Sequence, residues 1–204
     1  DGKELLEVDA TGKKLRTIST LKVIPGENLT LSLDFYLQKE AYSALGNRKG
    51  AVIVSKSQTG EILALVSGPS FDPDKIGDFL NSPDQPLFNR SISGTFPPGS
   101  TFKIITATAG LETGAINKNT IIEDTGVLVI GPYKFPNWKW LKGGGVEGNL
   151  DIVGAIAKSN DIFFYKTGEW IGIDNLINWA KRFGLGAKMG VDLPGEAQGL
   201  IKKD

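Results

Sequence analysis

Runs of alternating and periodic apolar residues divide the chain into strand-like and helix-like segments. Two short apolar stretches, residues 5–8 and 15–18, flank a turn sequence at 10–13, and this order predicts a β-hairpin. Residues 28–33 alternate polar and apolar side chains, which is typical of a half-buried strand. The beginning of the chain is therefore predicted to form short strands.

A helix and a second hairpin are expected next. Asp34 precedes a helical pattern that ends at Gly46, so its side chain is expected to cap that helix. Residues 51–54 and 62–66 are rich in β-branched and aliphatic side chains, and a turn sequence at 58–61 joins them. This arrangement predicts two antiparallel strands after the helix.

The rest of the chain predicts mainly helices. Residues 67–99 form a long, proline-rich segment, and a loop of that length inside a compact domain is usually functional. Residues 100–111 read as a helix that is apolar nearly all round, so we expect it to be buried centrally. After a mixed, glycine-rich stretch, aspartates open two further helical patterns, 151–170 and 174–184.

Composition limits the chemistry that these elements can carry. The 204 residues include 23 basic and 23 acidic side chains, and this balance gives no reason to expect nucleic acid as a partner. No apolar run reaches the roughly 18 residues that cross a bilayer. The chain has no cysteine and no histidine, which excludes thiol catalysis and a Ser-His-Asp triad. Any general base must therefore be Lys, Asp, Glu or Tyr.

Two Ser-x-x-Lys sequences pair a serine with a lysine. Ser19 lies in a β-branched stretch, where positions i and i+3 point to opposite faces, so Lys22 cannot serve it. Ser100 follows Pro-Pro-Gly at residues 97–99, a sequence that interrupts regular structure, and it opens a helix. Lys103 then lies one turn further along the same face of that helix. The second sequence is therefore the candidate for chemistry.

The physical chemistry of the second pair fits acyl transfer. An apolar setting disfavours the charged form of an amine, so Lys103 could take the proton of the Ser100 hydroxyl without any histidine. The helix N-terminus adds positive potential where an oxyanion would develop. The residues leave a second interpretation open, in which Ser100 only caps a core helix and Lys103 extends into water.

The surrounding sequence resembles a known family. Residues 86–90 and 94–103, PLFNR and GTFPPGSTFK, closely resemble the penicillin-binding protein transpeptidases. The likeness is greatest to the class B, elongation-type branch, penicillin-binding protein 2. Further similar stretches follow in the family's order along nearly the whole chain: residues 50–54, 59–64, 69–73, 183–186 and 192–196. The resemblance favours Ser100 as the nucleophile that forms the acyl-enzyme and Lys103 as its general base.

The resemblance also implies roles for a second motif, Ser159-Asn160-Asp161. It implies that Ser159 hydrogen-bonds Lys103 and relays a proton to the leaving amine. It further implies that Asp161 holds the Lys103 ammonium and helps to position the peptide. Such roles are chemically reasonable, because a lysine base needs a partner for its protonated form. The alternative is an ordinary polar cluster at the start of a helix.

Residues 166–168 spell the family's third motif, Lys-Thr-Gly, but they follow closely after Ser159 inside a helical pattern. The resemblance places the true motif on a strand opposite the serine helix. We therefore interpret 166–168 as a coincidence in the last turn of a helix that Gly168 ends. The true third motif is then missing, and we expect these 204 residues alone to be inactive or nearly so.

Some elongation-type members hold a metal between the first two motifs, with carboxylates, a histidine and a cysteine as ligands. Asp124 lies in the corresponding region, but residues 143–145 are glycines where a histidine is common, and the chain has no cysteine. No metal and no other cofactor are therefore expected. Trp138 and Trp140 could form a ligand platform, although packing or surface exposure is the more common role of such residues.

The fold implied by the resemblance is α/β (α+β), the penicillin-binding protein transpeptidase and serine β-lactamase-like fold, in which helices flank an antiparallel sheet. Residues 1–29 would then be the end of the N-terminal pedestal. Residues 30–204 would be the N-terminal portion of the transpeptidase domain, whose C-terminal part is missing.

The implied activity is peptidoglycan D,D-transpeptidation, in which a serine acyl-enzyme cross-links D-Ala-D-Ala stem peptides. The implied partners are stem peptides, β-lactam antibiotics, a membrane glycosyltransferase and proteins of the elongation complex. The implied location is the extracytoplasmic, periplasmic face of the cell membrane, with the anchor outside this chain. Two alternatives stay open: a serine β-lactamase or β-lactam sensor, and a non-catalytic scaffold of the elongation complex.

Overall fold

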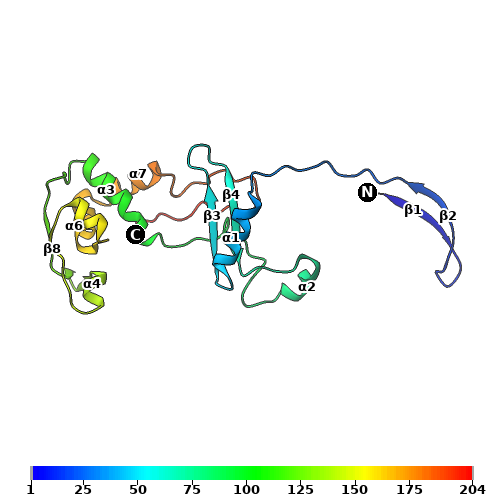
Figure 1. Cartoon of the computed structure of the whole chain (residues 1–204), viewed down its shortest axis with the longest axis horizontal. Coiled ribbons are helices and arrows are strands. Elements are labelled where there is room, and N and C mark those ends of the chain that lie inside the picture. The colour runs from blue at the N-terminus through cyan, green and yellow to red at the C-terminus, as the bar shows by residue number, and fades with distance from the viewer. Residues whose placement is uncertain (1, 204) are drawn as a thin grey trace.

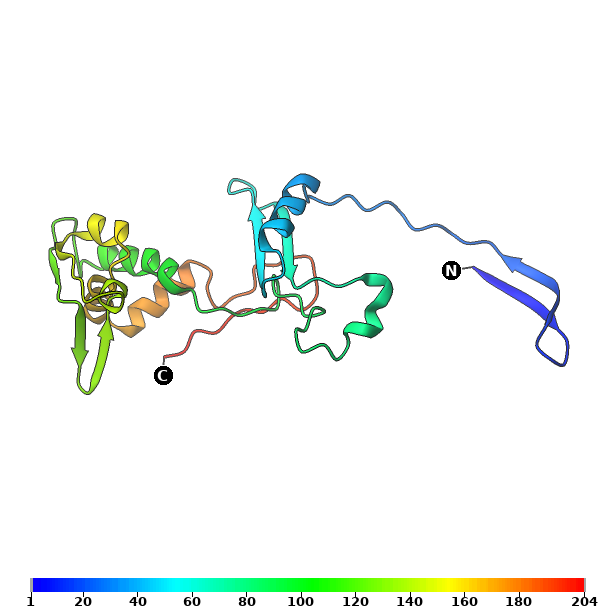
Figure 2. The same ribbon diagram turned by 60° about the horizontal axis from the view of Figure 1, so that its bottom comes forward.

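The computed structural model describes residues 2–203, which form an elongated chain of small packed units (Figures 1 and 2). The predicted N-terminal hairpin is confirmed, since β1 (Lys3–Val8) pairs antiparallel with β2 (Lys14–Leu21). Its side chains are almost all exposed. The hairpin lies at one end of the molecule, far from the helices at the other end (Figure 1).

The prediction of a strand at residues 28–33 is wrong, because residues 22–34 form a linking segment without regular structure. The apolar side chains that alternate in this link are exposed: Leu29, Leu31 and Leu33. A strand needs a neighbour that pairs with its backbone groups. The link meets the next unit only near its end, where the Asp34 N–H donates to the Leu63 carbonyl. Alternation by itself therefore did not produce a strand.

The helix and the second hairpin predicted after the link are confirmed. The elements are α1 (Phe35–Leu45), β3 (Gly50–Ser55) and β4 (Ile62–Gly68). The Asp34 carboxylate caps α1 by accepting the N–H groups of Tyr36 and Leu37, each at 2.9 Å. β3 and β4 pair antiparallel, and α1 packs on them (Figure 1). The contact buries a small core of Ala41, Ala64 and Val66.

The long segment after β4 carries two short helical turns, η1 (Pro73–Lys75) and α2 (Ile76–Phe79). Its returning end is tied to the sheet. The Ser91 hydroxyl donates to the Val66 carbonyl at 2.8 Å, and the Arg90 N–H donates to the Ser67 hydroxyl at 3.0 Å. These contacts fix the segment just before it enters the helical unit.

The remaining elements form a mostly helical unit with two small pairs of antiparallel strands. In chain order they are η2 (Gly99–Phe102), α3 (Lys103–Glu112), β5 (Ile122–Asp124), β6 (Val127–Ile130), β7 (Tyr133–Pro136), α4 (Trp138–Leu141), β8 (Gly148–Leu150), α5 (Ile152–Ala157), α6 (Asp161–Ile171) and α7 (Ile173–Arg182). β5 pairs with β8 and β6 pairs with β7, both antiparallel. Across the described residues, every helix is too short or too polar to cross a bilayer.

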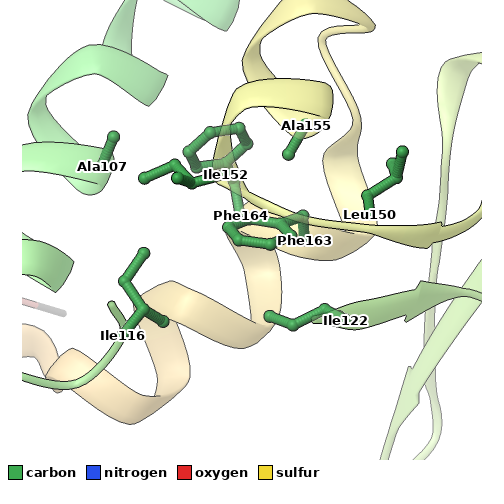
Figure 3. Close-up of a cluster of buried hydrophobic side chains, with 8 residues drawn as sticks. All are labelled: Ala107, Ile116, Ile122, Leu150, Ile152, Ala155, Phe163 and Phe164. Carbon is green, nitrogen blue, oxygen red and sulfur yellow. The ribbon is translucent and has the colours of Figure 1, made fainter. Parts of the chain in front are cut away.

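The core of this unit forms around α6 (Figure 3). The Phe163 side chain is fully buried, and its ring meets that of Phe164 edge-on with the centroids 5.4 Å apart. Aliphatic side chains from α3, the loop after it, β5, β8 and α5 surround the two rings: Ala107, Ile116, Ile122, Leu150, Ile152 and Ala155. Burial of apolar area is worth about 25 cal/mol per Å², so this core fixes α3, α5 and α6 relative to one another.

The prediction of a single helix after Asp151 is wrong, because the segment forms two helices, α5 and α6. Asp151 caps α5 as predicted, by accepting the Gly154 N–H at 2.8 Å. Asn160 then caps α6, by accepting the Phe163 N–H at 2.9 Å. An asparagine side chain that bonds the backbone in this way competes with continuation of a helix. The break places a short loop at residues 158–160.

Two predicted helix limits also differ. α6 continues past Gly168 and ends at Gly172, which has a positive φ of 78° that glycine adopts without strain. Asp174 lies in the first turn of α7 and does not cap it, since Gly172 also precedes that helix. One glycine therefore ends α6 and turns the chain directly into α7.

α3 is buried on one side only, which corrects the expectation of a helix buried all round. Its inner face includes Ile105, Ala107, Ala109 and Gly110, and the helix packs on α6 and α7. On the other face Ile104 is 60% exposed. The apolar pattern of α3 is thus wider than the surface that the described residues cover.

Candidate functional site

Ser100 lies in a tight turn that leads into the helix carrying Lys103. Gly99, with a φ of 57°, follows two prolines and enters the turn η2. α3 begins at Lys103 and not at Ser100 as predicted, but Lys103 lies one turn beyond Ser100, which agrees with the Ser-x-x-Lys spacing. Ser100 is exposed, so a substrate can approach its hydroxyl.

Three oxygen atoms hold the Lys103 ammonium. Nζ donates to the Ser159 carbonyl oxygen at 2.6 Å, to Ser159 Oγ at 3.1 Å and to Asp161 Oδ1 at 2.6 Å. The Lys103 side chain is 14% exposed and that of Asp161 is 20% exposed, so the pair is largely removed from water. An ammonium has three N–H donors. Each of them has an oxygen partner here, and charge-assisted bonds of this kind are stronger than neutral ones.

The Ser159 hydroxyl connects this amine to the Ser100 hydroxyl. Ser159 Oγ donates to Ser100 Oγ at 2.9 Å while it accepts from Lys103 Nζ. Among the described contacts, the Lys103 amine reaches Ser100 only through Ser159, whereas spacing alone suggested a direct approach. Ser100, Lys103, Ser159 and Asp161 therefore meet in one hydrogen-bonded chain.

Ser159 adopts an unusual backbone conformation in the break between α5 and α6. Its φ is 50°, in the left-handed region that few residues other than glycine visit. In this conformation both its carbonyl and its hydroxyl accept hydrogen bonds from the same amine. The next residue, Asn160, is fully buried, and its N–H donates to the Ala155 carbonyl at 2.9 Å. The loop is thus held from the inside of the unit.

Asn137 and Trp138 also hold Asp161. The Trp138 N–H donates to Asp161 Oδ2 at 2.9 Å, and the Asn137 side-chain oxygen accepts the Asp161 N–H at 3.3 Å. The Trp138 indole N–H donates to the Lys158 carbonyl at 3.0 Å. Sequence reasoning missed Asn137 and considered Trp138 only as a ligand platform or a packing residue. No local pattern could indicate these contacts, because Trp138 and Asp161 are 23 positions apart.

Asp124 is buried within this framework, and hydrogen-bond donors surround it. Oδ1 accepts the Gly126 N–H at 2.8 Å, and Oδ2 accepts the Asn137 and Asn160 side-chain N–H groups at 2.8 Å each and the Glu147 N–H at 2.9 Å. N–H donors point at both oxygens, three at Oδ2 and one at Oδ1, and a surrounding of hydrogen-bond donors does not fit a metal ion. Across residues 2–203 there is no group of three or more His, Cys, Asp or Glu side chains that could hold one.

Two titratable groups close to the framework have shifted pKa values. Hydrogen bonds from Lys139 and Lys158 lower the pKa of Glu147 below its ordinary value of 4.5, with N–O distances of 2.8 and 2.5 Å. Burial, and after it the negative charge of Asp161, raises the pKa of the Tyr165 hydroxyl. Glu147 therefore joins α4 to the loop before Ser159, and Tyr165 reports the charge of Asp161.

The two motif-like sequences that were set aside, residues 166–168 and the Ser-x-x-Lys sequence at Ser19, lie outside the hydrogen-bonded chain. Lys166, Thr167 and Gly168 are inside α6, as the helical pattern predicts. Thr167 is fully buried, and its hydroxyl donates to the Phe163 carbonyl at 2.8 Å. Ser19 lies on β2, at the opposite end of the molecule from α3 (Figure 1).

A largely apolar groove of about 720 Å³ lies beside the turn that precedes Ser100. Residues 94–98 and side chains of α7 line it, together with residues 197–202. The groove walls do not include Ser100, Lys103, Ser159 or Asp161. The groove and the hydrogen-bonded chain are therefore separate features.

Comparison with known proteins points to one family. Residues 50–204 match the family model for the penicillin binding protein transpeptidase domain. The chain is 40% identical to the peptidoglycan D,D-transpeptidase MrdA of Acinetobacter baumannii, over 98% of this chain and 31% of that protein. The chain spans about a third of the length of the curated relatives it matches.

Solved structures give the same result for the fold. Pseudomonas aeruginosa PBP2, in complex with WCK 5153, matches with a TM-score of 0.78 at 36% identity, over 91% of this chain and 43% of that chain. Helicobacter pylori PBP2, in complex with MreC, matches with a TM-score of 0.75 at 34% identity, over 96% of this chain and 38% of that chain. These matches confirm the predicted fold class, and the small sheets are consistent with part of such a domain.

Proposed function

This chain belongs to the penicillin-binding protein transpeptidase family, and we propose that it carries the nucleophile and the base of a peptidoglycan D,D-transpeptidase. The observation that carries the proposal is the hydrogen-bonded chain from the Ser100 hydroxyl, through the Ser159 hydroxyl, to the Lys103 amine. The name of the Acinetobacter baumannii relative supports the same reaction.

In the proposed reaction, Ser100 Oγ attacks the carbonyl carbon of the penultimate D-alanine of a stem peptide. For this step Lys103 is neutral and the two hydrogen bonds run opposite to those in the structure, so that Ser100 donates to Ser159 Oγ and Ser159 donates to Lys103 Nζ. The hydroxyl proton then passes through Ser159 Oγ to the Lys103 amine. The terminal peptide bond then breaks, and D-alanine leaves with a proton returned along the same route. The amine of a second stem peptide attacks the Ser100 ester, so that the cross-link forms and Ser100 regains its proton.

Asp161 is proposed to hold Lys103 in place and to stabilise the ammonium that forms during each transfer. The 2.6 Å contact between Asp161 Oδ1 and Lys103 Nζ supports this role. The Trp138 N–H fixes the other carboxylate oxygen, so the ammonium would form at a prepared position. A β-lactam would acylate Ser100 in the same way, with its ring amide in place of the peptide bond.

The setting of the site is part of the proposal. We propose that residues 1–29 end an N-terminal pedestal and that residues 30–204 are the first portion of the transpeptidase domain. The MreC complex of the Helicobacter pylori relative supports elongation-complex proteins as partners. Stem peptides and a membrane glycosyltransferase are the other proposed partners. Because these substrates lie outside the cytoplasm, the protein is proposed to act, anchored, at the periplasmic face of the cell membrane.

Labelling of the full-length gene product with fluorescent penicillin tests the proposal. We expect a long-lived covalent adduct that peptide mass spectrometry maps to Ser100, and its loss in Ser100→Ala. Ser19→Ala is the matched control, because it removes the serine of the other Ser-x-x-Lys sequence, and it should label as the wild type does. An adduct that persists in Ser100→Ala would overturn the assignment. Rapid release of hydrolysed penicillin would instead identify a β-lactamase.

A further inference from the structure

The buried carboxylate of Asp124 takes no part in the reaction proposed above. The residue is 2% exposed, and its partners among the described residues are N–H groups rather than a lysine or arginine. Removing an ionised carboxylate from water is costly unless hydrogen bonds compensate for the lost hydration. Asp124 and its donors are therefore bound to one another, and the position of the carboxylate determines the position of the donors.

Asp124 is a fixed point because its own strand is anchored. It is the last residue of β5 and pairs with Gly148 of β8. Ile122, two residues earlier on the same strand, is buried in the core of the helical unit (Figure 3). The Asp124 backbone thus depends on the sheet and the core, and not on the loops whose side chains it binds.

The carboxylate dictates which way two asparagine side chains point. An ionised carboxylate can only accept hydrogen bonds, so Asn137 and Asn160 must turn their amide nitrogens toward Asp124. Their oxygens then face the start of α6. The Asn160 oxygen accepts the Phe163 N–H at 2.9 Å, and the Asn137 oxygen accepts the Asp161 N–H at 3.3 Å. The first turn of α6 is therefore oriented from Asp124.

These asparagines are direct neighbours of the groups that hold the lysine base. Asn160 separates Ser159 from Asp161 in the chain, and Asn137 precedes Trp138, whose N–H donates to Asp161 Oδ2. Ser159 has a φ of 50°, and a conformation of that kind persists only where the surrounding contacts over-determine it. The Asp124 hydrogen bonds supply such contacts on the buried side of the loop.

We propose that Asp124 is a positioning residue for acyl transfer at Ser100. Acting through Asn160 and Asn137, it fixes the loop that presents the Ser159 hydroxyl and the carboxylate that follows it. It touches no reacting atom. The inference rests on the proposed function and names a residue that the proposed reaction leaves out.

Asp124→Asn in the full-length gene product tests this role, because it preserves the shape of the side chain and leaves one acceptor oxygen among four donors. We expect the first-order rate constant for acylation by penicillin to fall about 10- to 100-fold, since small misplacements of reacting groups cost rates of that order. The dissociation constant of the complex that precedes acylation should stay near the wild-type value. A purely structural role would reduce the folded fraction and leave its rate constant intact.

Two further variants separate positioning from folding. Asn160→Ser keeps an oxygen that can cap α6 and removes the donor to Asp124, so it should show the same loss of acylation rate. It carries the test if Asp124→Asn does not fold. Ile116→Ala removes contacts from the same core at a residue outside β5, so it should lower thermal stability while the acylation rate constant stays near the wild-type value.

The double variant D124N/N160S tests whether the two residues act through one contact. We expect its loss of rate to be no larger than the larger single loss, and multiplied losses would contradict the coupling. A wild-type rate constant in Asp124→Asn and Asn160→Ser, or an equal loss in Ile116→Ala, would overturn the positioning role and leave Ser100 as the nucleophile. Wild-type protein that forms no adduct at Ser100 would overturn the proposed function and this inference together.

Discussion

Two glycines on neighbouring helices should respond in opposite ways to the same substitution. Gly110 lies where α3 packs on α6, and a Cβ added there would stand 2.8 Å from Thr167 Cγ2 and 2.9 Å from Ile116 Cγ1. Both neighbours are buried, so neither can move away without disturbing the core. Gly168 lies within α6, and a Cβ added there would meet only open space beyond the neighbouring residues and backbone of its own helix.

The expected magnitudes follow from these surroundings. Overpacking a core costs about 1–3 kcal/mol, and alanine in place of a helical glycine returns up to about 1 kcal/mol. We therefore expect Gly110→Ala to lower the free energy of unfolding by about 1–2 kcal/mol. Gly168→Ala gains helix propensity without overpacking the core, so it should raise the free energy of unfolding by about 0.5–1 kcal/mol.

Urea unfolding of the full-length gene product, followed by tryptophan fluorescence, measures both effects. All four tryptophans of this chain lie in the helical unit, so the signal reports on the packing in question. Penicillin labelling of Gly168→Ala should equal that of the wild type. Stabilisation by both substitutions would refute the close packing of α3 on α6. Loss of labelling in Gly168→Ala would refute the interpretation of residues 166–168 as ordinary helix.

Two shifted pKa values give further predictions. Lys139 and Lys158 lower the pKa of Glu147, so its ionised form stabilises the fold above pH 4.5, and this contribution is lost as the pH falls through the lowered pKa. Glu147→Gln should therefore reduce the melting temperature at pH 7, with a difference that shrinks in acid; a difference independent of pH would contradict the ion pairs. Asp161→Asn removes the second cause of the raised Tyr165 pKa and leaves burial in place, so ultraviolet titration should show a partial fall of that pKa toward 10.0. An unchanged value would show that Asp161 carries no charge near Tyr165.

Features that depend on a few adjacent residues could be predicted from the sequence. The spacing of Ser100 and Lys103 on one helical turn follows from geometry within a single segment. The Asp34 cap and both hairpins follow likewise from local residue types. The strand predicted at residues 28–33 shows the limit of this reasoning, because a strand also needs a partner that no local pattern supplies.

The form of the candidate site depends on contacts between distant segments and could not be predicted in the same way. Apolar residues lie on both sides of the break, with Ile156 before it and Ile162 after it, so the sequence favours one unbroken helix. The break depends on Asn160, whose side chain binds Asp124 at a separation of 36 residues. A backbone donor such as the Trp138 N–H leaves no trace in residue type at all.

The left-handed backbone at Ser159 places the stability of the fold in conflict with the activity of the site. Glycine would adopt that φ freely, whereas a serine there retains strain on the order of 1–3 kcal/mol. Selection for thermal stability alone would therefore favour glycine at this position. That substitution would remove the hydroxyl that bridges Ser100 and Lys103. Laboratory evolution of a more stable variant would have to keep serine at this position, because the most stabilising substitution there would remove the hydroxyl that the proposed reaction needs.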